Sequence, residues 1–349
     1  MNEIITTITE IFNFAPLVWV ATPTLLAGLV AAEYYDSHVV SKYKLKRDSK
    51  EIDIKEIKLP PDLRENSTKI DIEKIENMYL GHRVIEFIEK VTKVLPKEEL
   101  TSLYNNINTV KIETMKQKLK RKLYNKKNAG EYISNKNQVL IKDERVIYHE
   151  LFHLASANTD EYVGFRQPTG IGRAINEGYT DLITERYFKD KMGYIGYPTE
   201  MAIVKEIENI VGEEKMRKLY FKTDLLGLIE ELKKYVPEED VLSFINGLDI
   251  LNRYNDTKNS FKGKKSEYAI KAVVDIMKLL VKIYYDKEHK KLDEGEISTE
   301  KFYKNVNAYY YKILFSLRVD HKDWEFEEFM DPVVEYVKNS YNDSKKQGR

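Results

Sequence analysis

Two histidines and a glutamate stand close together near the middle of the chain, at His149, Glu150 and His153. In an α-helix, residues four apart lie on one face, about 6 Å apart along the axis, so both imidazoles can bind one metal ion. Glu150 lies about 100° further round the helix, where it can reach a water molecule on that ion. This spacing predicts a metal centre with a carboxylate as general base.

A second pair of acidic residues follows on another predicted helix. Glu177 lies 24 residues after His153, and Asp181 lies four residues after Glu177, so the two carboxylates share a face. Glu177 can complete the set of metal ligands, while Asp181 can accept the N–H of a ligating imidazole and fix its tautomer. Because the chain contains no cysteine, a zinc ion must be held by histidine and carboxylate side chains.

These two segments, HELFH at 149–153 and NEGYTD at 176–181, resemble the gluzincin clan of zinc metallopeptidases. In that clan, H-E-x-x-H is followed by N-E-x-x-x-D on a second helix. The resemblance covers Asp143–Phe188, a small part of the chain, and its motifs are specific in combination.

The resemblance implies a role for each residue of the two motifs. One Zn²⁺ is expected to be bound by His149, His153 and Glu177. Glu150 is expected to act as the general base, and Asp181 as the hydrogen-bond partner of a ligating histidine, His149 in the first place. The implied activity is that of a zinc metallopeptidase, a hydrolase with a peptide or protein substrate, and an endopeptidase is the favoured form.

The chain departs from the clan's pattern in two respects. It has no G-x-M-E-N element, which marks the aminopeptidase branch, and the later His or Tyr that stabilises the oxyanion in many relatives is not identified. Tyr235 and Tyr254 lie at suitable distances along the chain. Two alternatives stay open, namely a membrane-tethered binding or scaffold protein with a catalytically silent zinc site, and a metal-dependent hydrolase of another substrate.

The sequence predicts an α+β fold that is mainly α-helical, with a small sheet and a helical C-terminal half, and the resemblance implies a zincin-like catalytic core. Glycine and proline are sparse, at 15 and 9 of 349 residues, which disfavours a turn-rich all-β architecture. Glu131–Ser134 and Gln138–Ile141 flank Asn135-Lys136-Asn137, and this pattern predicts a β-hairpin with a three-residue turn. Asp143 is expected to cap the helix that follows.

Helical periodicity appears on both sides of the two motifs. Apolar residues recur on one face of His82–Leu95, and Pro96 is expected to end that helix. Thr199 is expected to cap a helix that Gly212 closes, and the segment Ser266–Asp286 carries an apolar stripe typical of a buried helix face.

Four segments are expected along the chain. Residues 1–47 form a hydrophobic N-terminal segment with a basic flank, and residues 48–77 form a linker or extended lead-in. Residues 78–198 contain both motifs and form the catalytic core. Residues 199–349 form a helical C-terminal subdomain.

The run Phe14–Ala32 contains 19 residues without a charge, near the lower limit for a membrane-spanning helix. A single-pass anchor is the favoured interpretation; a cleaved signal peptide, which would indicate an exported protein, and a buried helix are the alternatives. If the run spans a membrane, Lys42, Lys44, Lys46 and Arg47 place the catalytic part on the cytoplasmic side.

The charge balance gives no indication of a polyanionic partner. Lys+Arg and Asp+Glu are equal, at 57 each. The basic run Met115–Lys127 is more typical of a solvated helix face, because Tyr124 is its only aromatic residue. We therefore expect no nucleic-acid partner.

Overall fold

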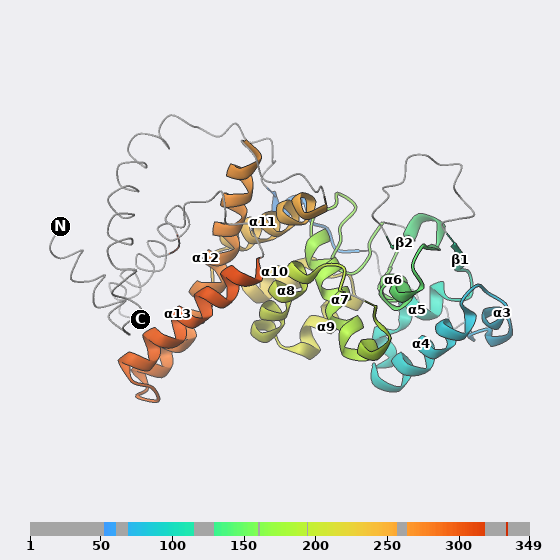
Figure 1. The fold of residues 1–349 in the computed structure, drawn as a ribbon, viewed down its shortest axis with the longest axis horizontal. Coiled ribbons are helices and arrows are strands. Elements are labelled where there is room, and N and C mark those ends of the chain that lie inside the picture. The colour runs from blue at the N-terminus through green and yellow to red at the C-terminus, as the bar shows by residue number, and fades with distance from the viewer. Residues whose placement is uncertain are drawn as a thin grey trace. The chain divides into compact units, whose positions relative to one another are not determined.

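The computed structural model of the chain describes residues 52–60, 69–114, 129–159, 161–193, 195–256, 264–317 and 333. This part of the chain is mainly helical and carries one small sheet, so the predicted α+β, mainly helical fold class is confirmed (Figure 1). Two compact units are present: one is formed by Ile52–Lys234, and the other contains the described residues from Tyr235 onward. All five residues of the predicted metal centre lie in the first unit.

Some predictions concern residues outside the described part. These are the N-terminal segment 1–47 with its possible membrane anchor Phe14–Ala32, and the basic run Met115–Lys127. Within the part of the chain that the structure describes, every helix is too short or too polar to cross a membrane.

The first unit opens with short elements in the region predicted as a lead-in. A 3₁₀ turn, η2 (Ile54–Glu56), is followed by α3 (Ile72–Glu76), and Ile57 and Ile75 are buried. The backbone N–H of Lys58 donates to the side-chain carbonyl of Gln167 at 3.2 Å. This contact joins the segment to the loop between the two motifs.

The amphipathic segment after residue 80 forms α4 (Gly81–Val94), which confirms the predicted helix. Its apolar face is buried at Val84, Phe87 and Val91, and the helix ends directly before Leu95-Pro96 because proline cannot supply the next hydrogen bond. A 3₁₀ turn, η3 (Lys97–Glu99), and α5 (Thr101–Asn106) follow.

The sheet has three strands in the order β1-β3-β2: β1 (Lys111–Thr114), β2 (Gly130–Ile133) and β3 (Gln138–Ile141). The antiparallel pairing of β2 with β3 confirms the predicted hairpin, while β1 pairs with β3 in parallel. The connection is one residue longer than predicted, because Ser134–Lys136 form a 3₁₀ turn and Asn137 adopts a left-handed conformation with φ 41°. The central strand β3 is buried throughout, and β2 lies at the end of the sheet order.

The two motif helices are α6 (Ile147–Ala155) and α7 (Arg173–Phe188). Asp143 does cap, as predicted, but it caps the 3₁₀ turn η6 (Glu144–Val146) that leads into α6, by accepting from the N–H of Arg145 at 3.0 Å. All nine residues of α6 are buried, so both helices belong to the core of the unit.

Three further helices complete the first unit: α8 (Pro198–Val211), α9 (Glu213–Phe221) and α10 (Leu225–Leu232). The prediction that Thr199 caps α8 is wrong. Pro198 already occupies the first turn, since its fixed φ suits a helix start, and no side chain caps this helix. The predicted end at Gly212 is confirmed, where φ is 96°.

The second unit is helical in its described part. It contains α11 (Glu238–Asp256), α12 (Lys264–Asp293) and α13 (Thr299–Ser316). The apolar stripe predicted within α12 is buried at Val273, Met277 and Leu280, as expected for a core face. The predicted division of the chain at residue 198 stays a prediction.

Candidate metal centre

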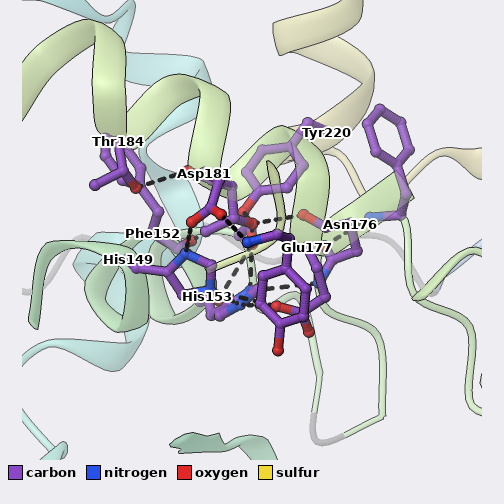
Figure 2. A network of polar contacts seen from close by, with 12 residues as sticks. His149, Phe152, His153, Asn176, Glu177, Asp181, Thr184 and Tyr220 are labelled. Carbon is purple, nitrogen blue, oxygen red and sulfur yellow. Dashed lines mark hydrogen bonds and ion pairs between the residues drawn. The ribbon is translucent and has the colours of Figure 1, made fainter. Parts of the chain in front are cut away.

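Three predicted ligands from two helices converge at one point. His149 and His153 lie one turn apart on α6, and Glu177 reaches them from α7 (Figure 2). The two Nε2 atoms are 3.0 Å apart, and Oε2 of Glu177 lies 3.3 Å from Nε2 of His149 and 3.2 Å from Nε2 of His153. Three residues separated by up to 28 positions of the sequence thus present three donor atoms to a common point.

The spacing of these donor atoms fits a tetrahedral zinc ion. Zinc binds imidazole nitrogen and carboxylate oxygen at about 2.0–2.2 Å, so two ligand atoms at a tetrahedral angle lie about 3.3 Å apart. The observed separations of 3.0, 3.2 and 3.3 Å match that edge. Two imidazole nitrogens that face each other repel unless a proton or a cation lies between them, so the arrangement suits a shared cation.

Asp181 orients the first histidine. Its Oδ1 lies 2.8 Å from Nδ1 of His149, and Oδ2 accepts the backbone N–H of Tyr197 at 2.6 Å (Figure 2). With Nδ1 as the donor, the Nε2 lone pair of His149 is left for a metal ion. The ring of Tyr197 also lies over that of His149, with centroids 6.0 Å apart and planes 24° from parallel. No sequence signal marked Tyr197, because its contact depends on how the chain enters α8.

The second histidine is surrounded by neutral polar groups. Its Nδ1 lies 3.3 Å from Nδ2 of Asn176 and 3.4 Å from the hydroxyl of Thr180. The Thr180 hydroxyl donates to the carbonyl of Asn176 at 2.7 Å and lies 2.8 Å from the hydroxyl of Tyr220 on α9. Thr180 can therefore accept the N–H of His153. The contacts of Thr180 and Tyr220 were not predicted from the sequence. The spacing of four residues between Asn176 and Thr180 on α7 could have indicated that these two side chains share a helix face; no spacing marked Tyr220.

Glu150 lies beside the ligands and against the edge strand. It is buried, with 5% of its surface exposed, and it accepts a hydrogen bond from the backbone of Tyr132 on β2. Gly130, two residues earlier on β2, makes room for it, since a Cβ there would lie 2.7 Å from Oε1 of Glu150. Burial raises the pKa of Glu150 to about 8, and the charge of His149 acts against this effect.

The charges of the three ligands depend on one another. Burial by itself lowers the pKa of His149, but the charge and hydrogen bond of Asp181, together with Glu177 and Glu150, outweigh it and hold the pKa well above its ordinary value. Burial lowers the pKa of His153, so its imidazole is neutral and able to bind a metal. Burial by itself raises the pKa of Glu177, and the two neighbouring histidines overcome this and keep the pKa well below its ordinary value.

The two tyrosines considered for oxyanion stabilisation are not among these contacts. Tyr235 belongs to the second unit, where 47% of its surface is exposed. The side chain of Tyr254 lies outside the described part. Neither residue is assigned a role in the centre.

Comparisons of the chain with protein family models, curated proteins and solved structures give no match. Conclusions about function therefore depend on the geometry and the chemistry of the centre.

Proposed function

We propose that the chain is a zinc-dependent peptidase with a zincin-like core, in which His149, His153 and Glu177 hold one Zn²⁺. The observation that supports this most strongly is the mutual separation of the three donor atoms, 3.0–3.3 Å, beside a buried carboxylate that is not one of them. A structural zinc site uses four protein ligands, whereas three ligands and a neighbouring base are typical of a catalytic site. The proposal is therefore hydrolysis rather than structural stabilisation.

Each residue has a defined task in the proposed reaction. When bound, zinc supplies Lewis acidity, which lowers the pKa of a water molecule to about 7 and polarises the scissile carbonyl. Glu150 accepts the proton of the attacking water and transfers it to the leaving amine. Asp181 keeps His149 in the tautomer that presents Nε2 to the ion.

The environment of Glu150 suits a group that must both gain and lose a proton. Burial raises its pKa to about 8 in the metal-free protein, and the positive charge of a bound zinc ion would lower it again, toward the range in which the carboxylate can accept a proton. The hydrogen bond from the backbone of Tyr132 fixes the carboxylate against β2. Because β2 ends the sheet order, an extended peptide can lie along it with its scissile bond near Glu150.

The test compares zinc content and peptide cleavage in the same preparations. We expect the parental chain to bind one zinc ion and to cleave members of a diverse peptide library, detected by mass spectrometry. Glu150→Gln should keep its zinc and lose activity by roughly 10²- to 10⁴-fold, because the amide cannot accept the proton. Glu89→Gln changes an exposed glutamate on α4 and serves as the matched control.

Two results would overturn the proposal. One is cleavage by Glu150→Gln at the parental rate, which would remove the assigned base. The other is stoichiometric zinc with no cleavage of any library member, which would instead indicate a binding protein with a silent zinc site.

A further inference from the structure

Arg166 belongs to the loop that joins the two motif helices. This loop is hydrogen-bonded to Asn176, which lies beside the metal centre. The backbone N–H of Phe165 donates to Oδ1 of Asn176 at 3.2 Å, and Nδ2 of the same amide lies 3.3 Å from Nδ1 of His153. Gly164, with φ 52°, allows this close approach, because a Cβ there would lie 2.1 Å from Asn176 Oδ1. The residue next to Arg166 is thus hydrogen-bonded to Asn176, whose side chain lies beside a predicted zinc ligand.

The positive charge of Arg166 interacts electrostatically with residues in and beside the metal centre. This positive charge interacts with the imidazole of His153 on α6. Burial raises the pKa of Glu131 on β2, and Arg166 is the first of the charges that oppose it. Arg166 therefore lies near both the ligand helix and the edge strand.

Arg166 is a half-buried residue, and its guanidinium has no hydrogen-bond or ion-pair partner among the described residues. A guanidinium carries five N–H donors in a planar fork that matches a carboxylate, so leaving it partly desolvated without an acceptor is costly. Buried pairs elsewhere in the unit show the usual solution, as Arg217 does with Glu99 at 2.7 Å. Arg166, in contrast, has no carboxylate partner among the described residues.

Glu131 provides a second observation at the same place. Its Oε2 atom is buried and makes no hydrogen bond. Glu131 and Arg166 attract each other electrostatically, yet no ion pair joins them, so their carboxylate and guanidinium do not satisfy each other. Among the described residues, the guanidinium of Arg166 and Oε2 of Glu131 thus both lack a hydrogen-bond partner, and a bound carboxylate can supply the acceptors that the guanidinium lacks.

We propose that Arg166 binds a carboxylate of the peptide substrate and so determines which peptides are cleaved. This inference rests on the proposed peptidase function. The carboxylate is either the C-terminal group of the peptide or the side chain of an Asp or Glu near the scissile bond, and both present the same two oxygens to the guanidinium. Arg166 is a binding residue in this account and takes no part in proton transfer.

The test uses matched pools of N-acetylated hexapeptides. The first pair of pools lacks Asp and Glu and differs only in a free or an amidated C-terminus. The second pair is amidated throughout and differs only in Glu or Gln at one internal position. Comparing kcat/KM within each pair, we expect the zinc-loaded parental chain to prefer the carboxylate in one of them by about 10- to 100-fold, the value of a charge-assisted hydrogen bond.

Arg166→Gln should abolish this preference, so that the ratio of kcat/KM within each pair of pools falls to about one. Arg83→Gln, which alters an arginine on α4 that pairs with Glu144, is the matched control and should keep the preference. Equal cleavage of both members of both pairs by the parental chain would overturn the inference, and so would an unchanged preference in Arg166→Gln.

A binding experiment distinguishes failure of this inference from failure of the proposed peptidase function. The same pools are passed over immobilised, zinc-loaded Glu150→Gln protein, with and without Arg166→Gln, and the retained peptides are quantified. We expect selective retention of the carboxylate pool only while Arg166 is present. Absence of selective retention refutes the role of Arg166, whereas selective retention together with no cleavage by the parental chain refutes only the peptidase.

Discussion

Asp181 lies 2.8 Å from Nδ1 of His149, and its other carboxylate oxygen accepts the backbone N–H of Tyr197 at 2.6 Å. Both carboxylate oxygens therefore accept a hydrogen bond, one from His149 in the metal centre and one from the backbone of Tyr197 at the start of α8. In the proposed zinc site, Asp181 would therefore influence how well the ion is bound without binding it.

Asp181→Asn should weaken zinc binding by about 10- to 100-fold. An amide has one acceptor oxygen where two are needed, so its NH₂ group would face either the imidazole N–H or the amide of Tyr197. Competition with a chelator measures the affinity. Asp190→Asn, at an exposed position after α7, should leave the affinity unchanged, and a parental affinity in Asp181→Asn would contradict the assigned role.

Gly130→Ala should lower peptide cleavage without removing zinc. The added methyl group would lie 2.7 Å from Oε1 of Glu150 and 2.6 Å from Val146, so the carboxylate must move. A displacement of about 1 Å is enough to reduce a rate by about 100-fold. The zinc content and kcat are measured together; if kcat is unchanged, β2 does not position Glu150.

Glu150→Gln should stabilise the metal-free protein in alkaline solution. The pKa of Glu150 rises from 4.5 in the unfolded chain to about 8 in the folded one, so between these values the folded state binds one more proton. Stability is therefore lost as the pH rises from about 4.5 to about 8. At pH 8.5 the variant should be more stable by up to about 4 kcal/mol.

Chemical denaturation of both forms in the presence of a chelator, at pH 4 and at pH 8.5, measures this difference. We expect the two forms to unfold at similar denaturant concentrations at pH 4, where the carboxyl group is protonated in both states. A gap between them that is the same at both pH values would show that the effect does not come from ionisation of Glu150.

The ion pair between Glu99 and Arg217 should be the most sensitive charged contact of the first unit. The two side chains are 4% and 13% exposed and 2.7 Å apart, so removing Glu99 leaves the largely buried Arg217 with the weaker contact to the exposed Glu213, at 3.9 Å. Glu99→Gln should cost about 3–5 kcal/mol of unfolding free energy. Glu230→Gln, which breaks an exposed pair with Lys233, should cost less than about 1 kcal/mol. Equal effects of the two changes would contradict this assignment.

The shared face of His149 and His153 was predictable because it depends on local geometry, whereas the prediction of Glu177 as the third ligand depended on the resemblance of the two motifs to a known clan. A spacing of four residues determines that two side chains share a helix face, whatever the rest of the chain does. Asp181 follows Glu177 by the same spacing. The helical character and the β2–β3 hairpin are local patterns too, and both were predicted.

The remaining features depend on contacts between distant segments. The parallel pairing of β1 with β3, the amide of Tyr197 at Asp181 and the space at Gly130 all arise from packing, which spacing does not encode. The error at Thr199 has a local cause, since the preceding Pro198 is itself a favoured first residue of a helix. Arg166 had no motif at all, and only its position in the fold draws attention to it.

The most direct test is the zinc stoichiometry and X-ray absorption spectrum of the purified full-length chain. The account predicts one zinc ion with two imidazole nitrogens and two oxygens at about 2.0–2.2 Å, and loss of stoichiometric zinc in His149→Ala and in Glu177→Ala. A chain that binds no zinc, or that binds it equally well after either substitution, would contradict the account.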